Sequence, residues 1–215
     1  MHTIVIANPK GGSGKTTLAT NIAGWLAGKR QAVAIADFDP QQSASEWLSR
    51  RPALFPVIGR WDPQAKRGSL ERSPQWLIVD TPAGVHTDSL REVLKRADAM
   101  LVPISPSAFD IAASHRFLGA LNEYKAIRQG ELPLGLVGMR VDARTHAAAE
   151  LDEFLKGTQL PVVGHLRDTQ VYVYCARDGA SVFDLPRSRA EQDCEQWRSL
   201  TRWISRQTLA SREAA

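Results

Sequence analysis

The chain has 215 residues, 43% of them hydrophobic, which is enough to bury the core of one α/β domain. It has no apolar run long enough to span a membrane, and its N-terminus lacks the basic region and cleavage site of a signal peptide. Two cysteines, Cys175 and Cys194, are too few for a disulfide framework or a metal-binding pattern. We therefore expect a cytoplasmic protein. The net charge of +4 is compatible with nucleic acid or anionic lipid as a partner, but requires neither.

Apolar, β-rich runs alternate with helical patterns along the chain. The predicted strands cover residues 3–7, 32–36, 76–79, 99–104, 134–137 and 162–164. The predicted helices cover residues 16–27, 43–50, 111–128, 143–156 and 188–205. Because the strands are continuous apolar runs, they favour a sheet that is covered on both sides. The expected fold class is α/β, a doubly wound, mostly parallel sheet with helices on both faces.

Two segments depart from this alternation. Residues 51–74 carry four prolines and several basic residues, which indicates an irregular insertion with room for one short strand. Residues 207–215 are polar and are expected to be frayed. We therefore predict a single domain over residues 1–206 and a polar tail over residues 207–215.

A glycine-rich loop, KGGSGKTT at residues 10–17, follows the first predicted strand and precedes the first helix. It contains the second half of the P-loop pattern G-x-x-x-x-G-K-[ST], with Pro9 where the first glycine is usual. Backbone N–H groups in such a loop converge on phosphate oxygens at the positive end of a helix dipole. Lys15 is expected to reach the β- and γ-phosphates of ATP, and the Thr16 hydroxyl is expected to bind Mg²⁺. The residues predicted to hold the nucleotide are Gly11, Gly12, Ser13, Gly14, Lys15, Thr16 and Thr17. The alternative is a glycine-rich turn with a chance match, which the flanking strand and helix disfavour.

Three carboxylates follow predicted strands. Asp37 and Asp39 come after strand 32–36, and Asp80 ends strand 76–79. Carboxyl ends of parallel strands meet at the edge where open α/β sheets bind ligands, so we expect these side chains beside the glycine loop. Asp80 matches a Walker B aspartate, which binds Mg²⁺ through water because Mg²⁺ keeps several of its waters. For Asp37 or Asp39 alone, a helix N-cap or turn role is the alternative.

These motifs, in this order, resemble the ParA/MinD family of deviant Walker A P-loop ATPases, and most of all its small ParA-type partition and positioning members. The resemblance runs from residue 2 to about residue 206 and rests on residues 10–17, 37–41, 80–84 and 138–145. It implies that Lys10 reaches across an ATP-bound homodimer to the partner's phosphates, a catalytic device like an arginine finger. It also implies that Asp39 positions or activates the attacking water and that Asp37 lies near Mg²⁺. In the last segment Met139 or Arg140 stands where the family has asparagine, and Arg140 is the candidate for contact with the nucleotide.

Arginines toward the C-terminus are candidates for DNA contacts. They are Arg167, Arg187, Arg189, Arg198, Arg202 and Arg206. The last three recur at i, i+4 spacing on one helix face, and the others lie where the chain resembles the DNA-binding side of the family. An arginine stripe suits phosphate backbones because each contact releases counterions without reading sequence. The alternative is a solvated face, since Glu191, Asp193 and Glu195 dilute its charge.

The resemblance implies a Mg-ATPase that dimerises on ATP, binds DNA nonspecifically and is stimulated by an adaptor of the ParB type or an equivalent. Such a cycle partitions or positions a cargo, which is a plasmid, a chromosome locus or a protein assembly. It implies a cytoplasmic, nucleoid-associated location with no membrane partner. Two alternatives from other classes are a MinD-like ATPase on a membrane surface and a metabolic P-loop amidoligase. The polar tail argues against the first, and the absence of an added substrate domain argues against the second.

Overall fold

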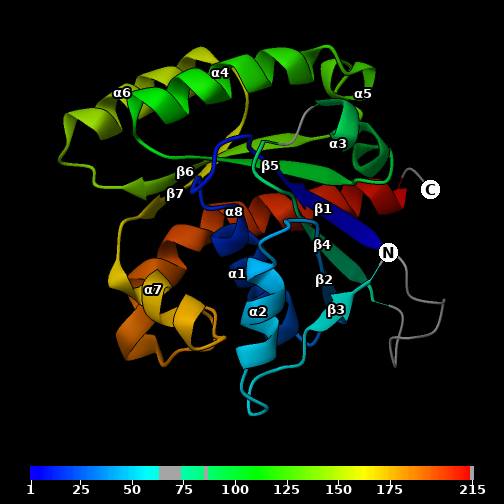
Figure 1. Cartoon of the computed structure of the whole chain (residues 1–215), viewed down its shortest axis with the longest axis vertical. Coiled ribbons are helices and arrows are strands. Elements are labelled where there is room, and N and C mark those ends of the chain that lie inside the picture. Colours follow the sequence, from blue (N-terminus) through cyan, green and yellow to red (C-terminus); the bar gives the residue numbers. More distant parts are fainter. Residues whose placement is uncertain (63–73, 85–86, 214–215) are drawn as a thin grey trace.

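A seven-stranded parallel sheet lies at the centre of the computed structural model, which describes residues 1–62, 74–84 and 87–213 (Figure 1). Its strands are β1 (His2–Ile6), β2 (Val33–Asp37), β3 (Gly59–Trp61), β4 (Trp76–Asp80), β5 (Ala99–Ile104), β6 (Leu134–Val141) and β7 (Val162–Arg167). They are ordered β3-β2-β4-β1-β5-β6-β7. The chain runs from β1 outward to β2 and β3, returns at β4, and then continues on the other side of β1. The loop after β1 therefore opens at the point where the direction reverses, which is where open α/β sheets bind ligands.

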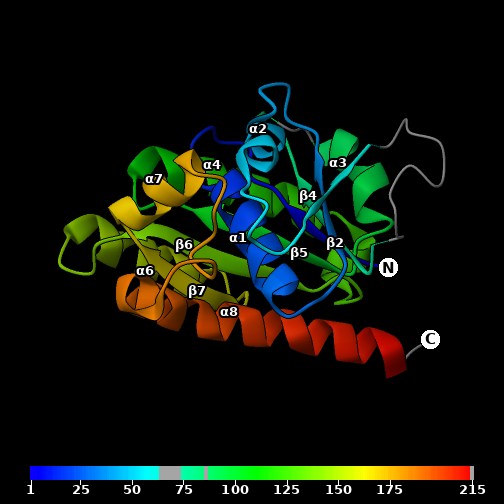
Figure 2. The same cartoon turned by 90° about the horizontal axis from the view of Figure 1, so that it is seen from below.

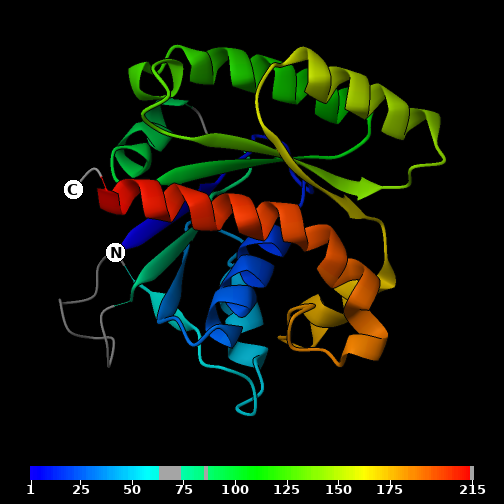
Figure 3. The ribbon, with the colours of Figure 1, turned by 180° about the vertical axis from the view of Figure 1, so that it is seen from behind.

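Helices cover both faces of the sheet. One face carries α1 (Lys15–Gly28), α2 (Ser43–Arg50), α7 (Gln170–Arg177) and α8 (Arg187–Glu213), packed through one cluster of buried side chains. The other face carries α3 (Thr87–Leu94), α4 (Ala108–Asn122), α5 (Lys125–Arg128) and α6 (His146–Gly157), packed through a second cluster. Helix α8 runs across its face of the sheet, as Figure 2 and Figure 3 show from two sides.

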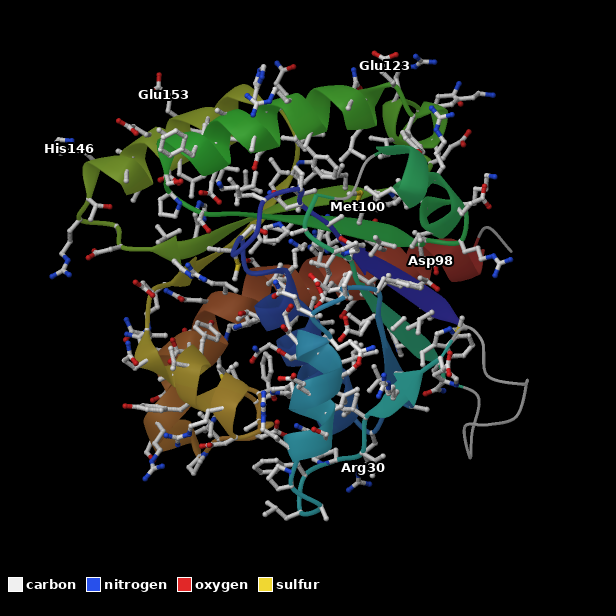
Figure 4. The ribbon with its side chains drawn as sticks, in the orientation of Figure 1. Arg30, Asp98, Met100, Glu123, His146 and Glu153 are labelled. Atoms are coloured by element: carbon white, nitrogen blue, oxygen red, sulfur yellow. The ribbon has the colours of Figure 1, made fainter. Side chains whose placement is uncertain are left out.

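Side chains separate by layer in the way that an α/β sandwich requires. Met100 on β5 is fully buried between the sheet and its helices. Glu123, His146 and Glu153 are exposed and point outward from the helical layer above it (Figure 4). Burial of apolar area from both faces of the sheet supplies the main favourable term for folding. This explains why the strands are continuous apolar runs rather than alternating ones.

The predicted fold class is confirmed, and all pairings among the described strands are parallel. Each of the six predicted strands has a counterpart, and the short strand allowed for in the segment 51–74 is β3, at the edge of the sheet. Residues 63–73 of that segment lie outside the described residues.

Helix boundaries differ from the predictions where caps decide them. The predicted helix 111–128 is two helices, and the first begins at Ala108 because the Asp110 N–H donates to Ser107 Oγ (3.1 Å). Helix α6 begins three residues later than predicted because Thr145 caps it in the same way. Helices α3 and α7 were not predicted at all.

The C-terminal helix is longer than predicted. We expected it to end at residue 205 and residues 207–215 to fray, but α8 continues to Glu213. The predicted end is wrong, because residues 206–213 contain neither glycine nor proline and so nothing in them stops a helix. The fraying of the tail stays a prediction. None of the helices in the described part of the chain is both long and apolar enough to cross a membrane.

Candidate functional site

The glycine loop lies between the end of β1 and the start of α1. Gly12 and Gly14 have positive φ angles of 76° and 97°, which favour glycine over residues with a side chain. A Cβ at Gly14 would also lie 2.6 Å from Met139 Cε, so the end of the Met139 side chain would have to move to admit one. The Lys15 side chain is buried, and its ammonium donates to the Lys10 carbonyl (3.1 Å). The loop thus folds back around Lys15 at the N-terminus of α1.

The strand register places two of the carboxylates together. Asp37 and Asp80 are direct partners where β2 pairs with β4, and Ile6 at the end of β1 pairs with Asp80 on the other side. Thr16 reaches this row from the first turn of α1, and its hydroxyl donates to Asp80 Oδ2 (2.7 Å). Asp80 therefore lies beside the glycine loop, where its place at the end of a parallel strand led us to expect it, and the roles of Thr16 and Asp80 toward Mg²⁺ stay predictions.

Burial dominates the electrostatics of Asp80. Its side chain is 1% exposed, and this desolvation raises its pKa to about 7, against the lowering effect of the Thr16 hydrogen bond. The nearby charge of Asp37 raises the pKa further, and Lys15 lowers it. Burial likewise lowers the pKa of Lys15, although Asp80 and Asp39 act in the opposite direction. The protonation of Asp80 and of Lys15 therefore depends on burial and on the charges beside each of them.

The residues around Asp80 fit a magnesium ion. Asp80 Oδ1 is buried and accepts no hydrogen bond from any residue that the structure describes. An unsatisfied carboxylate oxygen beside a threonine hydroxyl is a hard oxygen donor set, and Mg²⁺ typically uses one or two carboxylates together with substrate phosphates. Among the described residues there is no group of three His, Cys, Asp or Glu side chains that would hold a metal by themselves. Thr16 and Asp80 therefore suit a metal that arrives with a nucleotide.

Asp37 holds the segment that leads from β2 into α2. Its Oδ2 accepts from the Ser45 N–H (2.8 Å) and its Oδ1 accepts from the Asp39 N–H (3.1 Å). Asp37 thus has the local backbone role that we kept as an alternative. Its role beside Mg²⁺ stays a prediction. Asp39 Oδ1 accepts from the Gln41 N–H (2.9 Å), which fixes the turn that carries Asp39.

A cavity of about 340 Å³ joins these elements. Its walls are made by the glycine loop and the turn after β2, together with one residue each from β6 and the segment after β4. The lining residues are Gly11, Gly12, Ser13, Gly14, Lys15, Thr16, Thr17, Asp39, Gln41, Ser43, Ala83 and Arg140. Every residue predicted to hold the nucleotide is among them. Arg140 is exposed and adopts a left-handed φ of 52° near the end of β6. Met139 is buried against Gly14 and does not line the cavity, so of the two residues only Arg140 faces the cavity.

Lys10 lies at the front of the loop, on an anchor that the sequence reading missed. Its side chain is exposed and makes no hydrogen bond or ion pair with any described residue, while its N–H donates to Asn8 Oδ1 (2.8 Å). Asn8 is fully buried and donates to the Pro103 carbonyl (2.8 Å) and to Ser114 Oγ (3.0 Å). The available signal was a polar residue directly after a buried strand, which must find partners inside the fold.

The segment after β4 touches the same part of the loop. The Gly84 N–H donates to the Pro9 carbonyl (2.7 Å), next to Lys10. Gly84 belongs to residues 80–84, one of the segments that carry the family resemblance, and this bond connects that segment directly to the front of the loop.

The six arginine candidates differ in their environment. Five are exposed: Arg187, Arg189, Arg198, Arg202 and Arg206. Arg167 instead forms two hydrogen bonds to the buried carboxylate of Asp193 (2.7 and 3.1 Å) and one to Gln192 (2.6 Å). Removing Arg167 would leave a buried charge unpaired, so its contacts support a structural role in tying β7 to α8.

Three features define a P-loop nucleotide-binding protein: a glycine loop after the central strand, a buried lysine in that loop, and a threonine–aspartate pair at the carboxyl ends of the strands. Residues 4–180 match the family described as the CobQ/CobB/MinD/ParA nucleotide binding domain, and the chain belongs to this family. It is an ATPase of the ParA/MinD type.

Named relatives cover nearly the whole chain. The chain is 27% identical over 199 residues to maintenance of carboxysome distribution protein A of Halothiobacillus neapolitanus, covering 89% of this chain and 91% of the relative. It is 30% identical over 188 residues to the protein of that name from Gloeobacter kilaueensis, covering 83% and 82%. A plasmid partition protein of Borrelia burgdorferi bound to AMPPNP has a similar fold, with a TM-score of 0.69 at 17% identity over 94% of this chain and 98% of that one.

The raised pKa of Asp80 predicts how binding depends on pH. A carboxylate must lose its proton before it binds a cation, so the affinity for Mg²⁺ with nucleotide should rise from about pH 6 to about pH 8. Asp80→Asn should bind Mg²⁺ with nucleotide more weakly and without this dependence. Titration of a fluorescent ATP analogue with Mg²⁺ at each pH measures both effects, and an equally steep rise in the variant would contradict the assignment.

The stability of the nucleotide-free protein should change in the opposite direction. The folded-state pKa of Asp80 lies above its ordinary value of 3.8, so the native state binds more protons than the unfolded state between the two values. The contribution of Asp80 to the free energy of unfolding therefore falls as pH rises from about 4 to about 7, by up to about 4 kcal/mol. Denaturant unfolding of the original protein over this pH range measures this fall in the free energy of unfolding. Asp80→Asn is the control, because it lacks the group whose protonation causes the fall.

Proposed function

We propose that this protein is a Mg²⁺-dependent ATPase that dimerises on ATP, binds DNA nonspecifically as that dimer, and positions a cargo with the help of an adaptor that stimulates hydrolysis. The observation that carries the proposal is Lys10. Lys15 fills the place of the loop lysine, while Lys10 lies exposed next to Gly11 on the cavity wall. The loop therefore carries a second cation that its own fold leaves uncompensated.

A second copy of the chain gives Lys10 a partner. If two protomers met face to face at their nucleotide cavities, each Lys10 would reach the phosphates bound by the other, and the contact would close under two-fold symmetry. The nucleotide would then be part of the interface, so dimerisation would depend on ATP. The anchoring of Lys10 through Asn8 to β5 and α4 supports this role, because a cation that must meet a phosphate benefits from a fixed backbone.

Hydrolysis would use Asp39 and the loop. Bound Mg²⁺ supplies neutralisation of charge on the phosphate oxygens, and Thr16 and Asp80 are the residues that would hold it. Lys15 and the backbone N–H groups of the loop would hold the phosphates. Asp39 Oδ1 is occupied by the Gln41 N–H, whereas Oδ2 accepts no hydrogen bond from a described residue and is free to orient a water. Activation of that water by a positioned carboxylate is the step that Asp39 would contribute.

The exposed face of α8 supports DNA binding. Arg202 and Arg206 have no ion pair with a described residue, and Arg198 pairs only with the exposed Glu195 (2.6 Å). Exposed ion pairs of this kind contribute little, so a phosphate can replace Glu195 at small cost. The ion pair of Arg167 with the buried Asp193 takes Arg167 out of the proposed surface. That surface is the stripe of Arg198, Arg202 and Arg206, and Arg187 and Arg189 at the start of the same helix remain further candidates.

Reversing charge on this face tests the DNA surface. We expect Arg198→Glu with Arg202→Glu to weaken binding of ATP-loaded protein to random-sequence duplex by about 10- to 100-fold and to leave basal hydrolysis unchanged. Arg116→Glu with Arg128→Glu is the matched control, because both residues are exposed on α4 and α5 in the opposite layer. Fluorescence anisotropy with a labelled duplex measures the effect. Undiminished binding by the α8 variant would show that this stripe is only solvated surface.

The remaining parts of the proposal concern partners and location. An adaptor of the ParB type, or an equivalent, would stimulate hydrolysis and release the dimer from DNA, so the protein would be cytoplasmic and associated with the nucleoid. The two relatives named for carboxysome distribution match over most of both chains, which supports a protein assembly as the class of cargo.

A further inference from the structure

A groove between the loop after α2 and helix α7 lies outside the nucleotide site. Its volume is about 580 Å³, and its mostly apolar lining includes Phe55, Val171, Tyr174 and Leu185. We name it the α2–α7 groove. The nucleotide cavity contains none of its residues, so the two sites are separate.

The two segments that form the α2–α7 groove also carry exposed apolar residues. Tyr174 lines it and is 52% exposed, and the next residue along α7, Val173, is 55% exposed. The loop that contributes Phe55 also exposes Leu54 (80%) and Val57 (85%). An apolar groove whose two walls also carry exposed apolar side chains is typical of a surface that binds a protein. It is poorly suited to the phosphate backbone of DNA, which needs charge rather than apolar area.

Charged residues on the rim of the groove indicate which charge a partner should carry. Arg177 is paired with Asp178 (2.6 Å), so these two rim charges cancel. Arg189 also lines the groove and is exposed, and its guanidinium has no hydrogen bond or ion pair with a described residue. The same holds for exposed Arg187 at the start of α8. The acidic residue nearest in sequence, Glu191, lies outside the lining. The groove thus presents apolar surface beside uncompensated positive charge.

The walls of the groove are attached to the segment that shapes the nucleotide site. Trp47 on α2 is buried and its indole N–H donates to the carbonyls of Cys175 (3.2 Å) and Ala180 (3.1 Å), both of which line the groove. Arg51 forms two hydrogen bonds to Asp184 (2.9 and 3.0 Å) in the connection between α7 and α8. The other end of α2 is held by Asp37 through the Ser45 N–H. Helix α2 therefore connects the groove directly to Asp37, which lies beside Asp80 at the ends of β2 and β4. Helices α2 and α7 and the start of α8 lie on the same side of the sheet in Figure 1.

We propose that the α2–α7 groove binds an acidic amphipathic segment of a partner protein, whose apolar side chains fill the groove and whose carboxylate pairs with Arg189. Binding of this segment needs only the geometry of the groove. The further assignment of the segment to the adaptor, acting on hydrolysis through α2, rests on the proposed function.

A phage-displayed library of random linear peptides, selected on the ATP-bound protein, is the probe. Enriched peptides should combine apolar residues with Asp or Glu, and a synthetic copy should bind Arg189→Glu and Tyr174→Ala at least about tenfold more weakly. Arg198→Glu, with the same charge change elsewhere on α8, should bind the peptide normally. A peptide with its acidic residue changed to lysine should regain affinity for Arg189→Glu, which an effect of misfolding would not produce.

The outcomes separate the groove from the ATPase cycle. Failure to enrich such peptides, or equal binding by all variants, overturns the proposal, and a loss of duplex binding in Arg189→Glu alone would assign this rim to DNA instead. Peptide binding to a protein that never dimerises with ATP would support the groove and contradict the proposed function. Addition of the peptide should change the rate of ATP hydrolysis, and an unchanged rate would overturn the assignment to the adaptor.

Discussion

Lys10→Ala is expected to bind ATP about as well as the original protein but to lose ATP-dependent dimerisation and at least about 10²-fold of its turnover. Lys15 and the loop backbone, which would hold the nucleotide within one protomer, are unchanged by this substitution. The lost ammonium is the one that the fold leaves exposed beside the cavity. Equilibrium binding of a fluorescent ATP analogue, analytical ultracentrifugation with ATP or ADP, and a phosphate-release assay measure the three quantities.

Two variants control this experiment. Lys125→Ala removes another exposed lysine, on α5 and outside the nucleotide cavity, and should dimerise and turn over ATP normally. Lys10→Arg keeps the charge and should dimerise to a measurable extent. Full dimerisation and turnover by Lys10→Ala would mean that Lys10 is a solvated residue at the edge of the loop, and the proposed dimer would have no support.

Asp39→Ala is expected to lower the rate of ATP hydrolysis by about 10²- to 10⁴-fold while ATP still binds. Lys15 and Thr16 still line the cavity and Asp80 still pairs with Thr16, so the ATP-bound dimer should accumulate rather than decay. Single-turnover hydrolysis, with dimerisation followed by light scattering, measures both effects in one preparation.

Asp39→Asn separates chemistry from local structure. The asparagine side-chain oxygen can still accept from the Gln41 N–H, so the turn after β2 should keep its shape. If Asp39 acts through its charge, the asparagine variant should hydrolyse ATP as slowly as the alanine variant. Normal hydrolysis by Asp39→Asn would assign Asp39 to the turn alone.

Much of the fold could be predicted from hydrophobic pattern alone, because burial on both sides of a parallel sheet requires continuous apolar strands. Helix α7 could not, since its sequence QVYVYCAR consists largely of β-branched and aromatic residues that favour strands. Packing overrides that preference: Cys175 is buried in the same cluster as Trp47 and Trp197. The predicted end of α8 at residue 205 is too early, because the polar residues after it suggest an unstructured tail although none of them breaks a helix.

The candidate site divides in the same way. The loop residues follow from a local motif, and the place of Asp80 beside the loop follows from its position at the end of a parallel strand. The Asn8 anchor to Ser114 and the Arg167–Asp193 ion pair join residues far apart in the chain, so no local pattern indicates them. The backbone contacts of Asp37 and the burial of Met139 against Gly14 depend on how loops pack around the cavity.

Binding of random-sequence duplex by Asp39→Ala, with ATP or with ADP over a series of salt concentrations, tests the central claim most directly. The variant should hold the ATP state long enough to measure at equilibrium. We predict tight binding with ATP, weak binding with ADP, and an affinity that falls steeply as salt rises because arginine–phosphate contacts release counterions. Equally weak binding in both states, in a protein that still binds ATP, would contradict a DNA-dependent positioning ATPase.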